Sequence, residues 1–381
     1  MKKLIRITTV PSSLRTLLRG QSRFMSDYYE VIGISGDGDA LAEVRSNEGI
    51  KTHVVKMTRT ITPLKDLKAA YQLYKFFKKE RPDIVHTHTP KAGTLGMLAA
   101  KLAGVPHRLH TIAGLPLLEI SGHKRKLLDL VEKFTYKCAT HILPNSIGLK
   151  KIILENAYTT SDKLTVIANG SSNGIDTNHY DAKFVTEQQR TGLRQELGIS
   201  NDDLVFIFIG RIVKDKGINE LIQAFDNLSK NYSACKLLLV GPREAHLDPI
   251  LPETESLIEK NNAILAVGVQ KDIRPYVAIA HVLAFPSYRE GFPNVVLQCS
   301  CMELPCIVSD INGCNEVIAH GINGLIVPVK DVNALEEAMQ YMIDNPEERK
   351  AMIPNTRSRI VERYEQEFVW NELLKFYQNL D

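Results

Sequence analysis

The sequence lacks long apolar runs, and this absence excludes one class of protein. A membrane-spanning helix needs about 18 consecutive apolar residues, whereas the longest runs here, such as 204–209, have the length of a strand. The amino-terminal segment MKKLIRITTV begins with basic residues, but Arg6 interrupts its apolar part too early for the core of a signal peptide. We therefore expect a cytoplasmic chain that does not span a membrane.

Cysteine is also scarce, and its pattern argues against disulfide-rich and metal-binding proteins. Six cysteines among 381 residues fit the reduced thiols of a cytoplasmic protein. Four of them lie between Cys299 and Cys314, but their spacings lack paired C-x2-C knuckles and no histidine falls among them. His86 and His88 also suggest zinc, yet no third ligand stands nearby in the sequence. No bound metal is expected.

Neither a biased composition nor a strong net charge is present. Apolar residues make up 44%, charged residues 24% and aromatic residues 7%, which excludes disordered, collagen-like and coiled-coil chains. The net charge of +3 hides an asymmetry, because residues 1–170 carry 27 Lys and Arg against 14 Asp and Glu, while residues 171–381 carry 20 against 30. No basic motif with interleaved aromatics indicates a nucleic-acid partner.

Short apolar runs alternate with amphipathic segments of helical length, which is typical of parallel sheets covered by helices. The strands expected are 3–9, 30–35, 51–56, 83–87, 107–112, 140–144 and 164–168, then 204–210, 237–241, 263–269, 282–285, 306–309 and 325–329. The clearest helix spans 63–80, where one face carries lysines and the other carries apolar residues at helical spacing, namely Leu64, Leu67, Ala70, Tyr71, Tyr74 and Phe77. The turn-rich segment 168–177 predicts a hinge between two α/β domains, each a doubly wound parallel sheet.

The segment GRIVKDKG, residues 210–217, directly follows the first strand of the second domain. Ligands of doubly wound sheets bind beyond the carboxyl ends of the strands. Arg211 and Lys216 offer a forked donor and a point charge to a diphosphate at this position. The alternative is that both are solvated cations on a loop.

The segment PSYREGFPNVVLQ, residues 286–298, follows another strand of the second domain. Gly291 permits close approach of a ligand to the backbone, and a helix beginning near Asn294 and Val295 presents free amides. Glu290 and Gln298 lie eight residues apart, so both polar ends can contact one ligand. The alternative for Glu290 is an ordinary acid that stabilises the helix dipole.

These two segments closely resemble the carboxyl-terminal signature of retaining glycosyltransferases of family 4. The resemblance extends to VIANG and NGID within 166–176, to Gly268 with Asp272, and to SD, G and E between 309 and 316, so it spans nearly the whole chain. It implies the GT-B fold, in which two Rossmann-like domains face a cleft. The domains expected are 1–170 and 178–363, with a last helix at about 364–381 that packs on the first domain.

The resemblance also assigns roles to single residues. It implies that Arg211 and Lys216 bind the diphosphate of the donor, that Glu290 contacts the transferred sugar, and that Gln298 binds the ribose where the family has a second acid. The remaining donor-site residues that it implies are Gly210, Val269, Asn294 and Val295. His110 matches a catalytic histidine near the donor sugar, although a lone histidine on a strand is more often a satisfied core residue.

The first half departs from the family pattern. Residues 8–13 (TTVPSS) stand where a glycine-rich loop is usual, and the absent G-x-G-x-x-G argues against dinucleotide binding because Pro11 cannot donate an amide. Ser12 and Ser13 are expected either to cap the following helix or to meet a phosphate. Lys91 either attracts the phosphate of an acceptor or is a solvated lysine.

The implied reaction is a retaining, metal-independent transfer of a hexose or N-acetylhexosamine from a nucleotide sugar, by family habit a UDP-sugar. The implied acceptor is a glycan, in particular a polyprenyl-diphosphate-linked one, in capsule or O-antigen synthesis, and no cofactor is needed beyond the donor. A nucleotide-sugar epimerase of the same fold and a non-catalytic sugar-nucleotide-binding protein are the alternatives.

The basic first half is the half that binds acceptors in this family. Its helix 63–80 and the run HKRK at 123–126 indicate peripheral docking on the anionic inner face of the cell membrane. The alternative is that these basic segments only keep the domain soluble.

Overall fold

The computed structural model describes residues 1–244 and 248–380, and the chain divides into two compact units. Unit 1 comprises Met1–Gly174 with Gln366–Asp381, and unit 2 comprises Ile175–Glu365. These limits fall a few residues from the domain boundaries expected from the sequence, and the last helix belongs to unit 1. Within the described residues, every helix is too short or too polar to cross a bilayer.

Unit 1 is built on a six-stranded parallel sheet with the order β3-β2-β1-β4-β5-β6. Its strands are β1 (Lys3–Ile7), β2 (Glu30–Ser35), β3 (Lys51–Val54), β4 (Ile84–Thr87), β5 (His107–Ile112) and β6 (His141–Pro144). Its helices are α1 (Pro11–Leu17), α2 (Gln21–Ser26), α3 (Asp39–Glu48), α4 (Pro63–Glu80), α5 (Pro90–Ala103), α6 (Gly122–Cys138), α7 (Ile147–Glu155) and α16 (Gln366–Gln378), with 3₁₀ turns η1 (Pro116–Glu119) and η2 (Ser161–Lys163).

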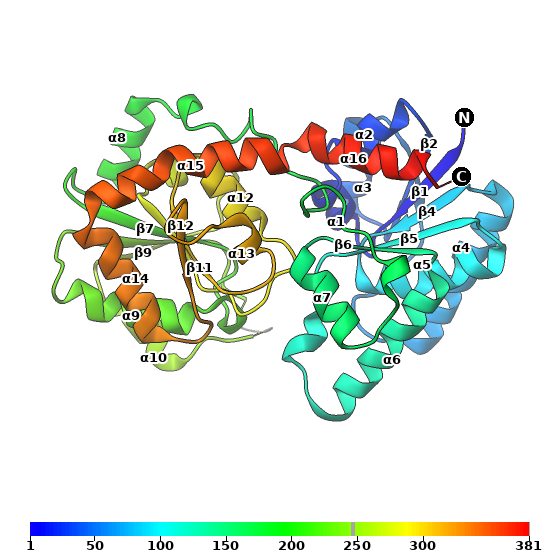
Figure 1. Cartoon of the computed structure of the whole chain (residues 1–381), viewed down its shortest axis with the longest axis horizontal. Helices are drawn as coiled ribbons and strands as arrows, with labels where there is room; N and C mark the ends of the chain where they lie inside the picture. Colours follow the sequence, from blue (N-terminus) through cyan, green and yellow to red (C-terminus); the bar gives the residue numbers. More distant parts are fainter. Residues whose placement is uncertain (245–247, 381) are drawn as a thin grey trace. The chain divides into compact units, whose positions relative to one another are not determined.

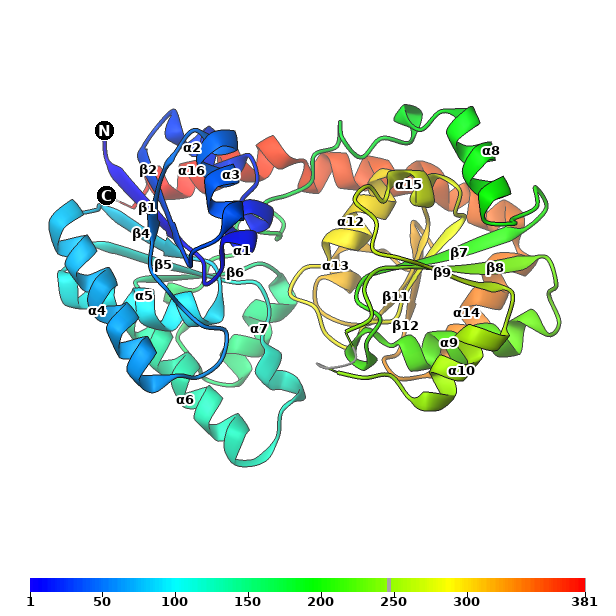
Figure 2. The same ribbon diagram turned by 180° about the vertical axis from the view of Figure 1, so that it is seen from behind.

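Helices cover both faces of this sheet, as Figures 1 and 2 show. Because successive strand residues point to opposite faces, Ile5 of β1 packs into a core with α4, α5 and α6, whereas Leu4 packs into a second core with α1, α2, α3 and α16. β1 therefore carries buried apolar residues on both of its faces, which explains why its sequence is mostly apolar rather than strictly alternating.

Unit 2 repeats this architecture with the order β12-β11-β10-β7-β8-β9. Its strands are β7 (Leu204–Ile209), β8 (Cys235–Val240), β9 (Ile264–Gly268), β10 (Val282–Phe285), β11 (Cys306–Ser309) and β12 (Gly324–Val327). Its helices are α8 (Glu187–Glu196), α9 (Ile218–Ser229), α10 (Pro252–Lys260), α11 (Arg274–Ala278), α12 (Asn294–Cys301), α13 (Cys314–Val317), α14 (Val332–Asp344) and α15 (Pro346–Tyr364), with 3₁₀ turns η3 (Ala182–Phe184) and η4 (Lys214–Lys216).

Both sheets are doubly wound, so the predicted fold class is confirmed. In each unit the first strand lies between the second and the fourth, and the strand order reverses at this point. Ligands of such sheets bind at the reversal, beyond the carboxyl ends of the two strands that border it. The reversal lies between β1 and β4 in unit 1 and between β7 and β10 in unit 2, and the predicted site segments 8–13, 88–93, 210–217 and 286–298 follow these four strands.

One predicted strand is wrong. The structure describes all of residues 164–168 but places no strand there, and Leu164 forms only an isolated bridge with Ile142. The chain then turns sharply, because Ala168 adopts a left-handed conformation with φ of 50°. A left-handed residue cannot continue a strand, so the short apolar run was misleading.

The predicted apolar face of the helix at 63–80 is wrong in part. The bounds of α4 are as predicted, but its buried residues are Ala69, Ala70, Leu73 and Phe77. Leu64, Leu67 and Tyr71 are instead 86%, 69% and 55% exposed. The wide apolar stripe of this helix therefore has a buried part and a part that faces solvent.

Candidate active site

The loops that follow β7 and β10 lie against each other in unit 2. Gly217 adopts φ of +70°, and a Cβ there would lie 2.1 Å from the carbonyl oxygen of Pro286. Only glycine allows this conformation together with so close an approach. The contact brings Lys216, at the end of η4, next to Glu290, although the two are 74 positions apart.

Lys216 and Glu290 form an ion pair, and both side chains are only 16% exposed. The hydroxyl of Ser287 donates to Oε1 of Glu290 at 2.9 Å, and Nζ of Lys216 lies 3.5 Å from the same hydroxyl oxygen. A pair this far removed from water is screened less than a surface pair. Lys216 is therefore not a solvated loop lysine, and Glu290 is more than an isolated first-turn acid.

Arg211 lies on the same loop but has different partners. Its Nη1 is 3.3 Å from Oε2 of Glu244, and its Nη2 is 3.7 Å from Oδ1 of Asp215. Asp215 also receives a hydrogen bond of 2.7 Å from Arg289. The Arg211 side chain is 37% exposed, so this guanidinium is held by acids at one side and open to solvent at the other.

The other predicted donor-site residues also lie beyond the carboxyl ends of strands of this sheet. Gly210, with φ of +156°, directly follows β7, and a Cβ at the neighbouring Gly241 would lie 1.8 Å from the carbonyl oxygen of Gly210. Val269 follows β9 and is 69% exposed. Asn294 is exposed and Val295 is half-buried in the first turn of α12.

Gln298 lies in α12 and is half-buried. Its Nε2 donates a hydrogen bond of 2.9 Å to the hydroxyl of Tyr180. An amide oriented in this way keeps its carbonyl oxygen as a further acceptor. Tyr180 thus holds the residue that replaces the second acid of the family signature.

Several residues of this site were not predicted. Asp215 and Ser287 lie inside the two segments that the sequence analysis selected, so their positions could have indicated that they belong to the site. Asn312 donates to the carbonyl oxygens of Glu290 and Gly291, but it comes from the loop after β11. Such long-range partners leave no local pattern in the sequence.

In unit 1, the loops after β1 and β4 are joined by threonines. The backbone N–H of Thr9 donates to Oγ1 of Thr89 at 2.9 Å, and the two hydroxyls lie 2.7 Å apart. The expectation that Ser12 and Ser13 cap α1 is wrong. The N-cap is Val10, whose side chain makes no capping hydrogen bond, because the helix begins at Pro11, before both serines.

Lys91 lies in the first turn of α5, next to Asp66 of α4. The two side chains form an ion pair and are 13% and 17% exposed. Asp66 also accepts hydrogen bonds from the backbone N–H and hydroxyl of Thr62 at 3.1 and 3.0 Å. Lys91 is therefore not a solvated lysine, and binding of a phosphate would require it to share this carboxylate.

His110 is a buried residue of β5, 3% exposed. Its Nδ1 lies 2.8 Å from the hydroxyl and 3.2 Å from the carbonyl oxygen of Thr87. A Cβ at Gly93 would lie 2.3 Å from its ring, so the imidazole packs directly on the backbone of α5. Burial lowers the pKa of His110 to about 4, although the bond to Thr87 opposes this shift.

The lowered pKa of His110 predicts acid sensitivity. The unfolded chain takes up a proton near pH 6.5 that the folded chain does not accept until about pH 4. The free energy of unfolding should therefore fall as the pH drops through this window, by up to about 1.4 kcal/mol per pH unit for this histidine. Urea unfolding of the His110→Gln variant should show a shallower pH dependence. The exposed His123 supplies the control, His123→Gln, and equal slopes in all three proteins would contradict the assignment.

Among residues 1–244 and 248–380, no group of three His, Cys, Asp or Glu side chains is arranged to hold a metal ion. His86 and His88 do lie side by side, with ring centroids 4.1 Å apart. Their neighbours are Tyr377, Thr111 and Arg6, which are not metal ligands in this setting.

Comparison with known proteins identifies relatives of both units. A family model described as group 1 glycosyl transferases matches residues 189–359, and one described as glycosyl transferase 4-like matches residues 11–146. The capsular polysaccharide biosynthesis glycosyltransferase CapM of Staphylococcus aureus is 34% identical over 378 residues, which cover 99% of this chain and 97% of that protein. The UDP-Gal:α-D-GlcNAc-diphosphoundecaprenol α-1,3-galactosyltransferase of Escherichia coli is 30% identical over 315 residues, which cover 81% and 78%.

Solved structures share the fold over the whole chain. HepE of Anabaena in complex with UDP matches with a TM-score of 0.82 at 18% identity, covering 99% of this chain and 100% of that one. A glycosyltransferase from Rickettsia africae matches with a TM-score of 0.81 at 20% identity, covering 100% and 98%.

Proposed function

Because the chain belongs to the group 1 glycosyltransferases, we propose that it moves a hexose or N-acetylhexosamine from a UDP-sugar to a polyprenyl-diphosphate-linked glycan. The choice of donor and acceptor is supported by the E. coli relative, whose name gives UDP-Gal and a diphosphoundecaprenol-linked GlcNAc. The CapM relative supports a place in surface polysaccharide synthesis. The observation that carries the proposal is the Lys216–Glu290 pair at the strand-order reversal of unit 2.

The chemistry proposed for this site is stabilisation of a departing nucleoside diphosphate. The bond between the anomeric carbon and the diphosphate oxygen breaks, and a bond to the acceptor hydroxyl oxygen forms on the same face, with the hydroxyl proton passing to the leaving diphosphate. Negative charge grows on that diphosphate, and fixed cations aimed at it lower the barrier. Arg211 and Lys216 supply these cations without a metal.

Glu290 and Lys216 do not compete for the same role. An ammonium has three donors, so Lys216 can keep its contact with Glu290 while another N–H reaches a phosphate oxygen. Glu290, fixed by Lys216 and Ser287, then faces the hydroxyls of the sugar. Arg211 is the more exposed cation and binds the diphosphate by turning its open side to it.

A thermal-shift panel of UDP-, GDP- and ADP-sugars tests the donor. A ligand at 100 times its dissociation constant stabilises the folded chain by about 2.7 kcal/mol, so one UDP-sugar should raise the melting temperature well above the GDP and ADP compounds. The same shift should be lost in Lys216→Ala and kept in Lys214→Ala, whose lysine is exposed on the same turn. Equal shifts for all nucleotides would contradict the proposal.

Gln298→Glu should keep turnover within a few-fold of the wild type. A carboxylate at this position accepts a hydrogen bond from Tyr180, where the amide now donates one, and it still accepts from a ribose hydroxyl. Gln298→Leu, which can do neither, should raise the KM for the donor about tenfold, as expected for loss of about 1.4 kcal/mol. Steady-state kinetics decide, and a folded but inactive Gln298→Glu would refute the ribose role.

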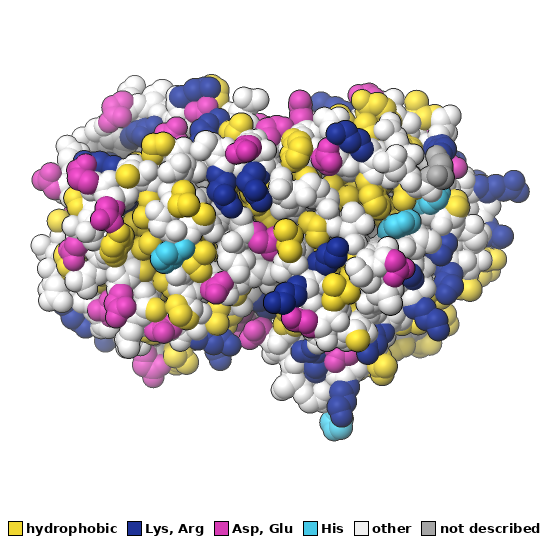
Figure 3. All heavy atoms as spheres, in the orientation of Figure 1, with side chains coloured by type: hydrophobic (Ala, Val, Ile, Leu, Met, Phe, Trp, Pro, Cys, Tyr) yellow, Lys and Arg dark blue, Asp and Glu magenta, His cyan; other side chains and the backbone are white. Residues whose placement is uncertain are grey.

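We also propose that unit 1 docks on an anionic membrane surface through α4 and α6. Both helices pack with α5 on one face of the sheet. Exposed apolar residues recur along them at i, i+3 and i+7, namely Leu64, Leu67 and Tyr71 of α4 and Leu127, Leu130 and Phe134 of α6. Exposed lysines border these stripes, and Figure 3 shows basic side chains beside hydrophobic ones over this region.

One part of the basic run at 123–126 does not contribute to this surface. Arg125 bonds to Asp129 at 2.8 Å and to Asn156 and Tyr158 at 3.1 and 3.2 Å, so it braces α6 internally. The lysines on either side of it are exposed. Each lysine near an anionic membrane surface contributes about 1 kcal/mol to the free energy of membrane binding. Leucines that insert into the membrane strengthen the binding further by burying apolar area.

Vesicle co-sedimentation tests the docking surface. The protein should bind vesicles of anionic phosphatidylglycerol and not neutral phosphatidylcholine, and salt should weaken the binding. The double variant Leu64→Ser/Leu67→Ser should bind at least about tenfold more weakly, since each leucine loses its buried apolar area. Ile322→Ser, a substitution of a 54% exposed residue of unit 2, is the control. Undiminished binding by the double variant would exclude this surface.

A further inference from the structure

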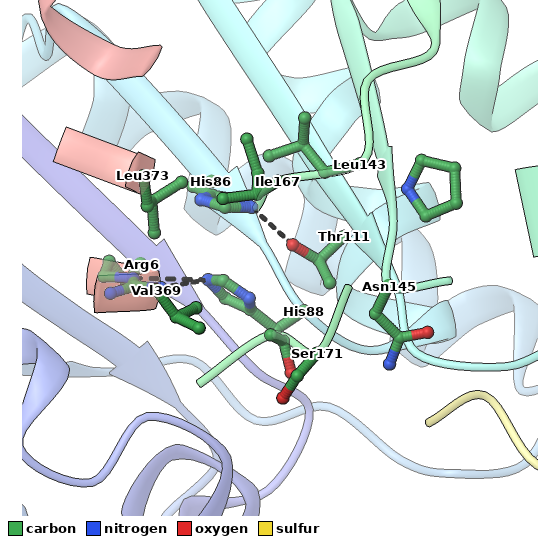
Figure 4. A pocket seen from close by; sticks show the side chains of 12 residues that line it. Arg6, His86, His88, Thr111, Leu143, Asn145, Ile167, Ser171, Val369 and Leu373 are labelled. Carbon is green, nitrogen blue, oxygen red and sulfur yellow. Dashed lines mark hydrogen bonds between the residues drawn. The ribbon is translucent and has the colours of Figure 1, made fainter. Parts of the chain in front are cut away.

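A small cavity in unit 1 is lined by polar groups that the proposed reaction does not use. It measures about 20 Å³ and lies between the sheet, the segment that leads out of unit 1 and α16. Its lining residues are Arg6, His86, His88, Thr111, Leu143, Pro144, Asn145, Ile167, Ser171, Ser172, Val369 and Leu373. Figure 4 shows Arg6 and His88 joined by a hydrogen bond at this cavity, with Ser171 nearby.

Arg6 is a fully buried cation, and no anion of the described residues neighbours it. Its exposed fraction is 0%, and across residues 1–244 and 248–380 no carboxylate forms an ion pair with it. The carboxylate of Glu48 attracts the Arg6 charge electrostatically but does not contact it. That carboxylate instead accepts hydrogen bonds from the backbone N–H groups of Gly20 and Arg23 at 2.8 and 3.0 Å. Burying an unpaired charge is strongly unfavourable, so this guanidinium needs a counterion.

The guanidinium still has a free donor. Its Nη2 donates to Oε1 of Gln21 at 2.5 Å, and its Nε donates to Nε2 of His88 at 3.3 Å. Within the described chain, Nη1 has no hydrogen-bond partner. A buried N–H group of a cation is the kind of donor that binds an anion.

His88 provides a second donor of the same kind. Arginine can only donate, so Nε2 of His88 must accept and the ring proton of the neutral imidazole must sit on Nδ1. Burial first, and then His86 and Arg6, lower the pKa of His88 well below its ordinary value, which keeps the ring neutral. The side chain is 3% exposed, and among the described residues Nδ1 has no partner.

Asn145 and Ser171 add polar groups to the lining. Ser171 accepts the N–H of Gly174 at 3.1 Å, which leaves its hydroxyl proton available. Oδ1 of Asn145 has no partner in the described residues. The two ends of an amide are exchanged by a half-turn, and that turn presents the NH₂ group of Asn145 to the cavity as another donor.

We propose that this cavity is a binding site for a small monovalent anion of the size of chloride. Among the described residues that line the cavity, the donors outnumber the acceptors, and the one fixed charge, that of Arg6, is positive. A cavity of this volume has room for one water molecule or one monatomic ion, which excludes a phosphate or a carboxylate ligand. A water molecule would satisfy the donors but would leave the charge of Arg6 unbalanced.

The anion would join the elements that lead into and out of unit 1. Ser171 and Ser172 come just before the limit of unit 1 at Gly174, and Val369 follows the return of the chain at Gln366. Gln21, which holds Arg6, also donates to the carbonyl oxygen of Ser172 at 3.0 Å. Occupation of the site should therefore stabilise the packing of both crossing segments on the sheet.

Anomalous diffraction from crystals of the full chain soaked in sodium bromide tests the proposal directly. We expect an anomalous peak within hydrogen-bond distance of Nη1 of Arg6 or Nδ1 of His88. An ordered water there without anomalous signal would overturn the proposal.

Thermal unfolding of the full chain supplies the solution test. The melting temperature should rise by roughly 3–6 °C for each tenfold increase in sodium chloride above the dissociation constant. Sodium gluconate at equal ionic strength should not reproduce the rise, because its anion is too large. Arg6→Met should lose the chloride response, while Arg108→Met, which removes a guanidinium bonded to backbone carbonyls, should keep it. A bromide peak without a chloride response would mean binding at crystal concentration only, and would also overturn the proposal.

Discussion

Lys216→Ala should lower kcat/KM by about 10²- to 10³-fold, the usual effect of removing one donor that stabilises charge in a transition state. The substitution removes a cation aimed at the leaving diphosphate and also frees the carboxylate of Glu290, which keeps the hydrogen bond from the hydroxyl of Ser287 at 2.9 Å. The loss should appear in kcat as well as in KM, because the charge on the diphosphate grows as the glycosidic bond breaks. Steady-state kinetics with the purified variant measure both.

Two variants of the same loop serve as comparisons. Lys214→Ala removes an exposed lysine of η4 and should stay within about twofold of the wild type, as surface changes usually do. Arg211→Ala should have a smaller effect than Lys216→Ala, since Arg211 is 37% exposed against 16% for Lys216. Circular dichroism confirms folding of each variant. A folded Lys216→Ala with wild-type turnover would remove the basis for the diphosphate site.

Gly217→Ala should destabilise the protein by about 3 kcal/mol or more and should also reduce activity. A left-handed alanine costs about 1–2 kcal/mol, and the added Cβ would lie 2.1 Å from the carbonyl oxygen of Pro286. The loop after β10 must then move, and Glu290 moves with it. Urea unfolding and kinetics on the same preparation should show both losses.

Gly198→Ala separates the two causes. Gly198 has nearly the same φ, +65°, but a Cβ there would meet nothing within 4 Å. This variant should cost only the conformational part, about 1–2 kcal/mol, and should leave kcat unchanged. If Gly217→Ala were no less stable than Gly198→Ala, the close contact between the two loops would not be required.

The sequence was most informative where structure is local. Runs such as LVFIFI at 204–209 indicated buried parallel strands, and the residues just after them fell at the strand-order reversals, where loops meet. The Lys216–Glu290 contact was not predicted, but it agrees with the topology, because β7 and β10 are neighbours in the sheet. Its partner Ser287 stood within a segment that was already singled out.

Long-range packing limited the rest. Nothing near Gln298 in the sequence points to Tyr180, and nothing near Glu290 points to Asn312, because these contacts depend on how distant loops fold together. Leu64 and Leu67 fitted a helical stripe, but the sequence could not tell which part of it the sheet would cover. Arg6 was read only as a break in an apolar run, whereas it is a fully buried cation at the centre of a polar cluster.

Mass spectrometry of a lipid-linked acceptor tests the central claim most directly. The full chain is incubated with a synthetic polyprenyl-diphosphate-linked N-acetylglucosamine and a panel of UDP-sugars, with Lys216→Ala and Lys214→Ala in parallel. The account predicts that the acceptor gains the mass of one hexose or N-acetylhexosamine with one UDP-sugar, that UDP is released, and that only Lys216→Ala loses the product. An unchanged acceptor together with an isomerised nucleotide sugar, or product formation that does not depend on Lys216, would contradict it.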